Sequence, residues 1–331
     1  PELFDRPGNP YLAADGSDWW DNGERFGVFS RIVAELAMDK HGIGWRADLV
    51  PANDWQTGLV PAFLAEESQP PATIFTIHNM AYQGNFPNSL FNYLNLPWHW
   101  WSAEGGLEFH GQMSMLKAGI EKADWVTTVS PTYAKEITWP EFAYGLEGVM
   151  ARKLGEGRLV GIINGIDQDV WNPATDRLIA RTYSAEKGRV AAKAENKRAL
   201  LNHFGWHESE IDPNIPVIGM VGRLVWQKGV DLVLDLIPQI LEQENVLGSG
   251  DREHHDALQR LAIYYPRRVL VYLGYSEALA HLVEAGSDIF LMPSRFEPCG
   301  LNQIYSLMYG TPPIVHSTGG LADTVVNATV E

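Results

Sequence analysis

The stretch Val217–Gln243, VIGMVGRLVWQKGVDLVLDLIPQILEQ, decides the fold. It begins as a short apolar run, Val217–Leu224, passes a loop with two cations, and continues as a helical pattern over Lys228–Gln243. A short β-branched run followed at once by an apolar helix predicts one half of a strand–helix–strand unit. The loop between them falls where such units bind ligands, at the carboxyl end of the strand.

The same alternation continues toward the C-terminus. We predict two further helices and three further strands, in the order strand Arg267–Tyr275, helix Glu277–Gly286, strand Ser287–Ser294, helix Leu301–Gly310 and strand Pro312–Ser317. Strands that alternate with helices form parallel sheets through right-handed crossovers. The second half of the chain is therefore expected to be a Rossmann-like α/β domain.

The first half repeats this pattern. The first predicted strand ends within Ala47–Asp54. Three more strands are predicted over Ala72–Asn79, Trp125–Ser130 and Arg158–Ile166, and two helices over Asp54–Glu67 and Met113–Ala123. After Trp171 a charged helical stretch, Ala185–Gly205, leads into the second half. We expect two Rossmann-like domains, 1–166 and 167–331, with parallel sheets that face a central cleft.

Composition excludes several classes of partner. The formal net charge of −16 disfavours nucleic acid and anionic membranes as partners. No apolar run is long enough to span a membrane, which takes about 18 residues. The single cysteine, Cys299, excludes an intrachain disulfide and favours a cytoplasmic protein.

The loop Val221–Gly229 is the first candidate site. Arg223 and Lys228 flank the start of the predicted helix. A diphosphate can be bound by the forked guanidinium of an arginine, by the point charge of a lysine and by the free backbone amides at the start of a helix. The alternative is a solvated basic loop, which is less expected in so acidic a chain.

Two further loops follow buried strands in the same half. Glu297 and Cys299 lie in the sequence Ser294–Gln303, where a carboxylate can accept hydrogen bonds from sugar hydroxyls, and Gly300 precedes a helix. Glu297 can equally be an anion that caps the N-terminus of the next helix. Cys299 is expected to be a buried apolar residue rather than a nucleophile. Thr318, Gly319 and Gly320 allow close backbone approach to a ligand, although such a pair is often only a tight turn.

In the first half, His78 and Asn79 end an apolar strand and favour a polar sugar site over a structural role. Asp54 follows the preceding strand, where capping of the next helix is an equally good interpretation. Asp167 and Asp169 form an Asp-x-Asp pair that could hold Mg²⁺, but turn and capping roles fit their position after Asn164-Gly165 better.

Several long motifs in order carry a family resemblance. They are FTIHNMAYQGNF, ANDWQTGLVPAFL, FAYGLEG, NGIDQDVWNPATD, VGRLVWQKGVDL and PSRFEPCGLNQIYSLMYGTPPIVHSTGGLADTV. Across essentially its whole length the chain resembles bacterial glycogen synthases and plant starch synthases. The resemblance implies a GT-B fold and a retaining glucosyltransferase without a metal or cofactor, which moves glucose from ADP-glucose to the nonreducing end of an α-1,4-glucan.

The resemblance also implies roles for named residues. Arg223 and Lys228 would bind the donor diphosphate, and Glu297 would hold the donor glucose together with the amides of Gly300 and Leu301. The remaining donor contacts would come from Cys299, Thr318, Gly319, Gly320 and Tyr275, the last beside the adenine. From the first half, Asp54, His78, Asn79 and Asn164 would face the glucose, and Tyr11 would reach the donor from a loop.

Finally, the resemblance implies strands before Pro1 and after Glu331, so the fold is expected to be incomplete at both termini. This raises an alternative, a segment that binds glucan or nucleotide sugar without transfer. Another sugar-nucleotide enzyme on the same fold is disfavoured by the FEPCG and HNMAYQG motifs, and a nicotinamide dehydrogenase by the absence of an early GxGxxG.

Overall fold

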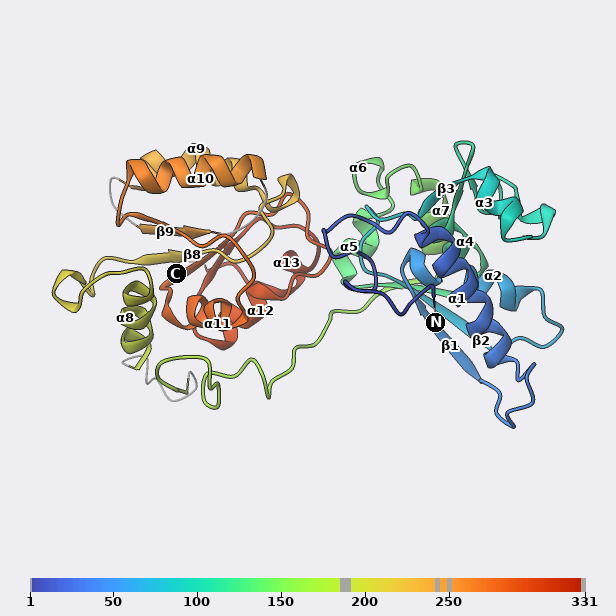
Figure 1. The fold of residues 1–331 in the computed structure, drawn as a ribbon, viewed down its shortest axis with the longest axis horizontal. Coiled ribbons are helices and arrows are strands. Elements are labelled where there is room, and N and C mark those ends of the chain that lie inside the picture. The colour runs from blue at the N-terminus through green and yellow to red at the C-terminus, as the bar shows by residue number, and fades with distance from the viewer. Residues whose placement is uncertain (1, 185–191, 242–244, 249–251, 329–331) are drawn as a thin grey trace. The chain divides into compact units, whose positions relative to one another are not determined.

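The structure is a computed structural model that describes residues 2–184, 192–241, 245–248 and 252–328. The chain divides into two compact units, Pro1–Ile162 and Ile163–Glu331, each with its own layers (Figure 1). The division falls a few residues before Ile166, the expected domain boundary. Parts of two predicted helices, 185–191 and 242–243, lie outside the described residues.

Unit 1 is built on a four-stranded parallel sheet in the order β1-β2-β6-β7. Its strands are β1 (Leu49–Asn53), β2 (Ala72–Ile77), β6 (Trp125–Thr128) and β7 (Leu159–Gly161). On β2, Phe75 and Ile77 are fully buried while Thr76 between them is partly exposed. This alternation places one face of the sheet in the apolar core.

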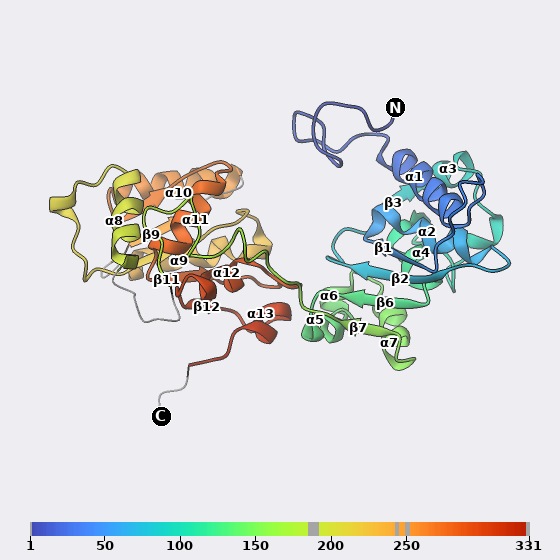
Figure 2. The ribbon, with the colours of Figure 1, turned by 90° about the horizontal axis from the view of Figure 1, so that it is seen from below.

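Helices cover this sheet. Figure 2 shows α1 (Asn22–Ala37), α2 (Leu59–Ala65) and α4 (Met115–Lys122) together on one side of β1 and β2. The other helices of unit 1 are short: α3 (Asn88–Tyr93), α5 (Pro131–Glu136), α6 (Pro140–Ala143) and α7 (Glu147–Gly155). The small antiparallel sheet β3-β5-β4 consists of Asn85–Pro87, Gln112–Ser114 and Glu108–Phe109.

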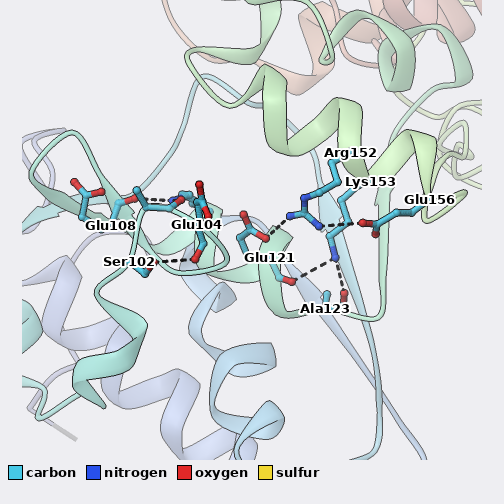
Figure 3. Close-up of polar contacts among 10 residues, drawn as sticks. Ser102, Glu104, Glu108, Glu121, Ala123, Arg152, Lys153 and Glu156 are labelled. Carbon is cyan, nitrogen blue, oxygen red and sulfur yellow. Dashed lines mark hydrogen bonds and ion pairs between the residues drawn. The ribbon is translucent and has the colours of Figure 1, made fainter.

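Two basic residues of α7 bind the end of α4 (Figure 3). Arg152 pairs with Glu121 and, at 3.2 Å, with Glu156, while the Lys153 ammonium donates to the carbonyl of Ala123 at 3.0 Å. Burial lowers the pKa of Lys153. Because carbonyls at a helix end lack intrahelical partners, Lys153 caps α4 from outside.

Unit 2 contains a five-stranded parallel sheet in the order β10-β9-β8-β11-β12. The strands are β8 (Val217–Gly219), β9 (Asn245–Gly248), β10 (Val269–Val271), β11 (Ile289–Met292) and β12 (Pro313–Val315). Figure 1 shows α9 (Val230–Ile240) and α10 (Arg252–Tyr264) on one face. On the other face lie α8 (Lys193–His203), α11 (Glu277–Gly286) and α12 (Asn302–Met308), and α13 (Gly319–Thr324) follows β12.

Both units thus form the expected α/β architecture, but the strands are shorter than predicted. The predicted strand over 217–224 is observed only for 217–219, and that over 158–166 only for 159–161. Pairing stops where the neighbour stops: Gly161 pairs with Thr128, the last residue of β6. The apolar run continues past this point, which is why the sequence overestimates the strand.

Candidate active site

In unit 2 the cation of Lys228 and the carboxylate of Glu297 form an ion pair. Lys228 ends the short helical turn Trp226–Lys228 after β8, and Glu297 lies in the loop after β11. Both side chains are largely buried, 18% and 8% exposed, and Ser294 donates a hydrogen bond to Glu297 at 3.0 Å. Removing one partner of such a pair leaves a buried charge uncompensated, so the two loops depend on each other.

Gly229 makes the approach of these loops possible. Its φ of 68° lies in the left-handed region, and a Cβ atom there would be 2.3 Å from the carbonyl oxygen of Pro293. A residue with a side chain would push the start of α9 away from the end of β11. Lys228 therefore reaches Glu297 because the next residue is glycine.

The Gly319-Gly320 turn packs against the Glu297 loop in the same way. A Cβ on Gly319 would lie 2.0 Å from the carbonyl oxygen of Glu297, and one on Gly320 2.1 Å from that of Cys299. The amide of Gly320 donates to the carbonyls of Glu297 and Pro298, at 3.0 and 3.2 Å. The Gly320 amide is thus engaged inside the protein, and the glycines bring Thr318, 3% exposed, against this loop.

Cys299 and Gly300 complete this group. Burial raises the pKa of the Cys299 thiol, while a hydrogen bond from the backbone amide of Asn164 opposes the shift. A buried, protonated thiol is a poor nucleophile, as expected for Cys299. Gln303, whose role the sequence did not predict, donates to the carbonyls of Cys299 and Gly300 and to Thr324, at 3.0, 3.1 and 3.0 Å.

The other predicted donor residues lie at the same edge of the sheet. Arg223 is exposed in the loop after β8, Tyr275 is 89% exposed after β10, and Leu301 stands before α12. Contacts therefore join Lys228, Glu297, Cys299 and the glycine turns directly. Arg223 and Tyr275 share with these residues only their location in loops that follow the carboxyl ends of the strands.

In unit 1 the structure joins Asp54, His78 and Asn79. The Asp54 carboxylate accepts the backbone amide of His78 at 2.8 Å and that of Asn79. The imidazole Nε2 of His78 lies 3.1 Å from the side-chain oxygen of Asn53, a partner that the sequence did not predict. The exposed imidazole is thus oriented at the carboxyl end of β2.

Asp54 sits in a strained position. Its φ of 54° is unusual for a residue with a side chain, and burial raises the pKa of its carboxyl against the opposing effect of the two amides. The alternative capping role of Asp54 is not observed: its side chain makes no capping hydrogen bond to the turn Trp55–Thr57. The ring of Tyr11, which is 50% exposed, packs against the ring of Phe26. The Phe26 ring in turn packs against Trp55, the residue that follows Asp54.

The segment after Asn164 is fixed to the rest of unit 2 by stacked rings. Trp171 lies between His281 and Tyr305, with centroid distances of 3.7 and 3.9 Å and interplanar angles of 16° and 6°. Next to it, Asp176 accepts hydrogen bonds from His281 and Tyr309, at 2.8 and 2.5 Å. Together with the Asn164 amide that donates to Cys299, these contacts bind the segment at both ends, and spacing could not reveal the His281 and Tyr309 contacts because the partners are over 100 residues apart.

The Asp167 carboxylate accepts the amides of Asp169 and Val170, at 2.9 and 3.3 Å, which is a turn role. Within the described residues no group of three His, Cys, Asp or Glu side chains could hold a metal ion. Over the same part of the chain, no helix has both the length and the apolar character needed to span a bilayer.

Comparisons with known proteins agree with this geometry. Residues 1–152 match the family profile described as starch synthase catalytic domain, and residues 207–330 match glycosyl transferases group 1. The glycogen synthase of Hydrogenovibrio crunogenus is 65% identical over the whole chain, which covers 68% of that protein. Glycogen synthase 1 of Methylococcus capsulatus is 50% identical, again over the whole chain and 66% of that protein.

Among solved structures, the catalytic domain of starch synthase IV from Arabidopsis thaliana, bound to ADP and acarbose, matches with a TM-score of 0.83 at 33% identity. That match covers 93% of this chain and 64% of the plant domain. The chain thus spans about two thirds of the length of the relatives that it matches. It belongs to the glycogen synthase family of retaining glucosyltransferases, which have the GT-B fold and use a nucleotide-sugar donor and a glucan acceptor.

Proposed function

We propose that this chain carries the donor site and catalytic groups for glucose transfer from ADP-glucose to the nonreducing end of an α-1,4-glucan, with retention of configuration. The observation that carries the proposal is the buried Lys228–Glu297 pair, enclosed by the glycine turns at Gly229 and Gly319-Gly320. In this pair a cation and a carboxylate that can accept hydrogen bonds from hydroxyls lie side by side at the carboxyl ends of β8 and β11, the end at which such sheets bind ligands.

On the donor side, Lys228 and Arg223 would neutralise the diphosphate. The bond between glucose C1 and the β-phosphate oxygen breaks, and the bonding electrons leave with ADP. Both cations counter the negative charge that develops on this leaving group. Glu297 would accept hydrogen bonds from glucose hydroxyls, and Cys299, Gly300, Leu301, Thr318, Gly319, Gly320 and Tyr275 would form the remaining donor wall.

On the acceptor side, the O4 hydroxyl of the terminal glucose forms the new bond to C1. Its proton would pass to the departing phosphate on the same face of the sugar, so no protein nucleophile is required. His78, oriented by Asn53 and by the hydrogen bond that its backbone amide donates to the Asp54 carboxylate, would contact the transferred glucose. Asp54, Asn79, Asn164 and Tyr11 would complete the sugar contacts. We place the reaction in the cytoplasm, in keeping with the single cysteine.

The experiment measures ADP binding by calorimetry and transfer of labelled glucose from ADP-glucose to maltooligosaccharides. Lys228→Ala should weaken ADP binding and lower transfer by at least about 100-fold, the usual loss for one stabilising donor. Arg198→Ala, an exposed cation on α8, is the matched control and should change neither quantity.

UDP-glucose is the competing donor in the same assay. ADP and glucan binding without any transfer would support the binding-only alternative. Undiminished transfer in the Lys228→Ala variant would show that the leaving group is stabilised elsewhere and would overturn the proposal.

A further inference from the structure

A second ion pair lies beside the Lys228–Glu297 pair. Arg295, two residues before Glu297, forms two parallel hydrogen bonds to Asp231, the second residue of α9, both at 2.6 Å. Such a fork is geometrically specific, because both guanidinium nitrogens and both carboxylate oxygens are used. The arginine lowers the pKa of the Asp231 carboxyl, so the pair is charged near neutral pH.

Arg295 also holds the turn that carries Lys228. Its guanidinium donates to the carbonyl of Trp226 at 3.0 Å and lies 4.7 Å from the centre of the Trp226 ring. Its backbone amide donates to the carbonyl of Gln227 at 2.9 Å, and the Gln227 side chain donates to the carbonyl of Phe296 at 3.2 Å. The two loops are thus linked on both sides of the Lys228–Glu297 pair.

These contacts are all made to other residues of unit 2, and both side chains of the fork remain partly exposed, Arg295 at 24% and Asp231 at 39%. Its guanidinium faces Asp231 and Trp226, whereas Lys228 and Glu297 face each other. A lysine ammonium sits on a flexible stem, so its position depends on the turn beneath it. Fixing that turn against the Glu297 loop therefore fixes where the cation stands when a diphosphate arrives.

We propose that Arg295 and Asp231 are positioning residues: their fork holds the Trp226–Lys228 turn against the Glu297 loop and thereby sets the geometry of donor binding. This inference rests on the proposed function and deepens it. On this proposal, the affinity for the donor depends in part on Arg295 and Asp231, which do not themselves contact the donor.

The test compares Arg295→Lys, Arg295→Ala, Asp231→Ala and the double alanine variant in the whole chain. A lysine keeps the charge but cannot form the fork, so Arg295→Lys should weaken ADP binding nearly as much as Arg295→Ala. We expect an increase in Kd of about tenfold for each alanine variant and no further increase in the double variant, as for residues in one network.

A second readout separates positioning from general destabilisation. Hydrogen exchange should accelerate at the amides of Lys228, Gly229 and Arg295, which now bond to Val225, Trp226 and Gln227 at 2.8, 3.1 and 2.9 Å. Exchange elsewhere in unit 2, including α11 and α12, should stay unchanged. Arg267→Lys, at the exposed pair with Glu210, is the matched control and should alter neither readout.

The outcomes are distinct. If the wild-type chain binds ADP and the Arg295 and Asp231 variants bind it equally well with unchanged exchange, the inference is wrong while the proposed function stands. Accelerated exchange throughout unit 2 would also overturn it, since the pair would then be a general stabiliser. If the wild-type chain fails to bind ADP, the proposed function and the inference that rests on it both fall.

Discussion

At the scale of single residues, Glu284 on α11 carries a buried carboxyl group whose charge is poorly compensated. It is 1% exposed, and its Oε2 atom has no hydrogen-bond partner within the described part of the chain. Burial raises the pKa of Glu284 well above 4.5, and nearby Lys193 opposes this shift. Because the folded-state pKa is the higher one, the stability contribution of Glu284 is present below about pH 4.5 and is lost as pH rises.

Glu284→Gln keeps the shape of the side chain but cannot ionise. We expect it to raise the free energy of unfolding by at least about 1 kcal/mol at pH 8, because each unit by which the folded-state pKa is raised costs the folded state about 1.4 kcal/mol at higher pH, with little change near pH 4.5. Urea denaturation at both pH values measures this. Glu277→Gln, exposed on the same helix, is the control, and equal stability of wild type and Glu284→Gln at pH 8 would contradict the interpretation.

At the scale of elements, Lys193 joins the start of α8 to the end of α11. Its ammonium donates to the carbonyls of Glu284 and Ala285 and to the hydroxyl of Thr311, at 3.2, 2.9 and 2.5 Å. Burial lowers the pKa of Lys193 to about 8. Lys193 thus caps α11 from another helix, as Lys153 caps α4 in unit 1.

The sign of the pH effect is opposite to that of Glu284. Between about pH 8 and 10.5 the unfolded chain binds more protons at Lys193, so stability rises with pH in this window. The stability difference between wild type and Lys193→Met should grow by about 2 kcal/mol from pH 8 to 10. Chemical denaturation across this range measures it, with exposed Lys135→Met as the control; a constant difference would show that Lys193 has an ordinary pKa when folded.

The order of eight strands and the helices α2, α4, α8, α9, α11 and α12 could be predicted from apolar runs and their spacing, and the predicted helix Glu277–Gly286 has the bounds of α11. The limits of strands could not be predicted, because they depend on where a neighbouring strand ends, as at Gly161. Helices α1, α3, α5, α6, α7 and α10 were not predicted. Helix α1 buries mainly small or polar residues, such as Gly23, Ser30 and Ala34, so its large apolar residues do not mark the buried face. Residue types also indicated the donor loops, whereas the partners of His78, Arg295 and Trp171 depend on tertiary contacts that spacing does not encode.

At the scale of the whole molecule, each unit has apolar cores of its own. Phe75, Ile77 and Leu64 belong to one core of unit 1, and Phe290, Leu200 and Val217 to one of unit 2. The contacts described above among Lys228, Glu297, Cys299, Gly320 and Asn164 all lie within unit 2. Separate cores imply that the two units can unfold in separate transitions, of which only one should respond to the nucleotide.

We therefore expect calorimetry of the whole chain to resolve two transitions, and ADP to raise the Tm of one. At a concentration of about 100 times Kd, ADP should stabilise that unit by about 2.7 kcal/mol. Glu284→Gln at pH 8 identifies the transition, because it should shift the same peak as ADP, while Lys228→Ala should abolish the ADP shift. Two peaks that move together with ADP would mean that the nucleotide itself is not bound by unit 2 alone, and the assignment of the nucleotide site to Ile163–Glu331 would then be wrong.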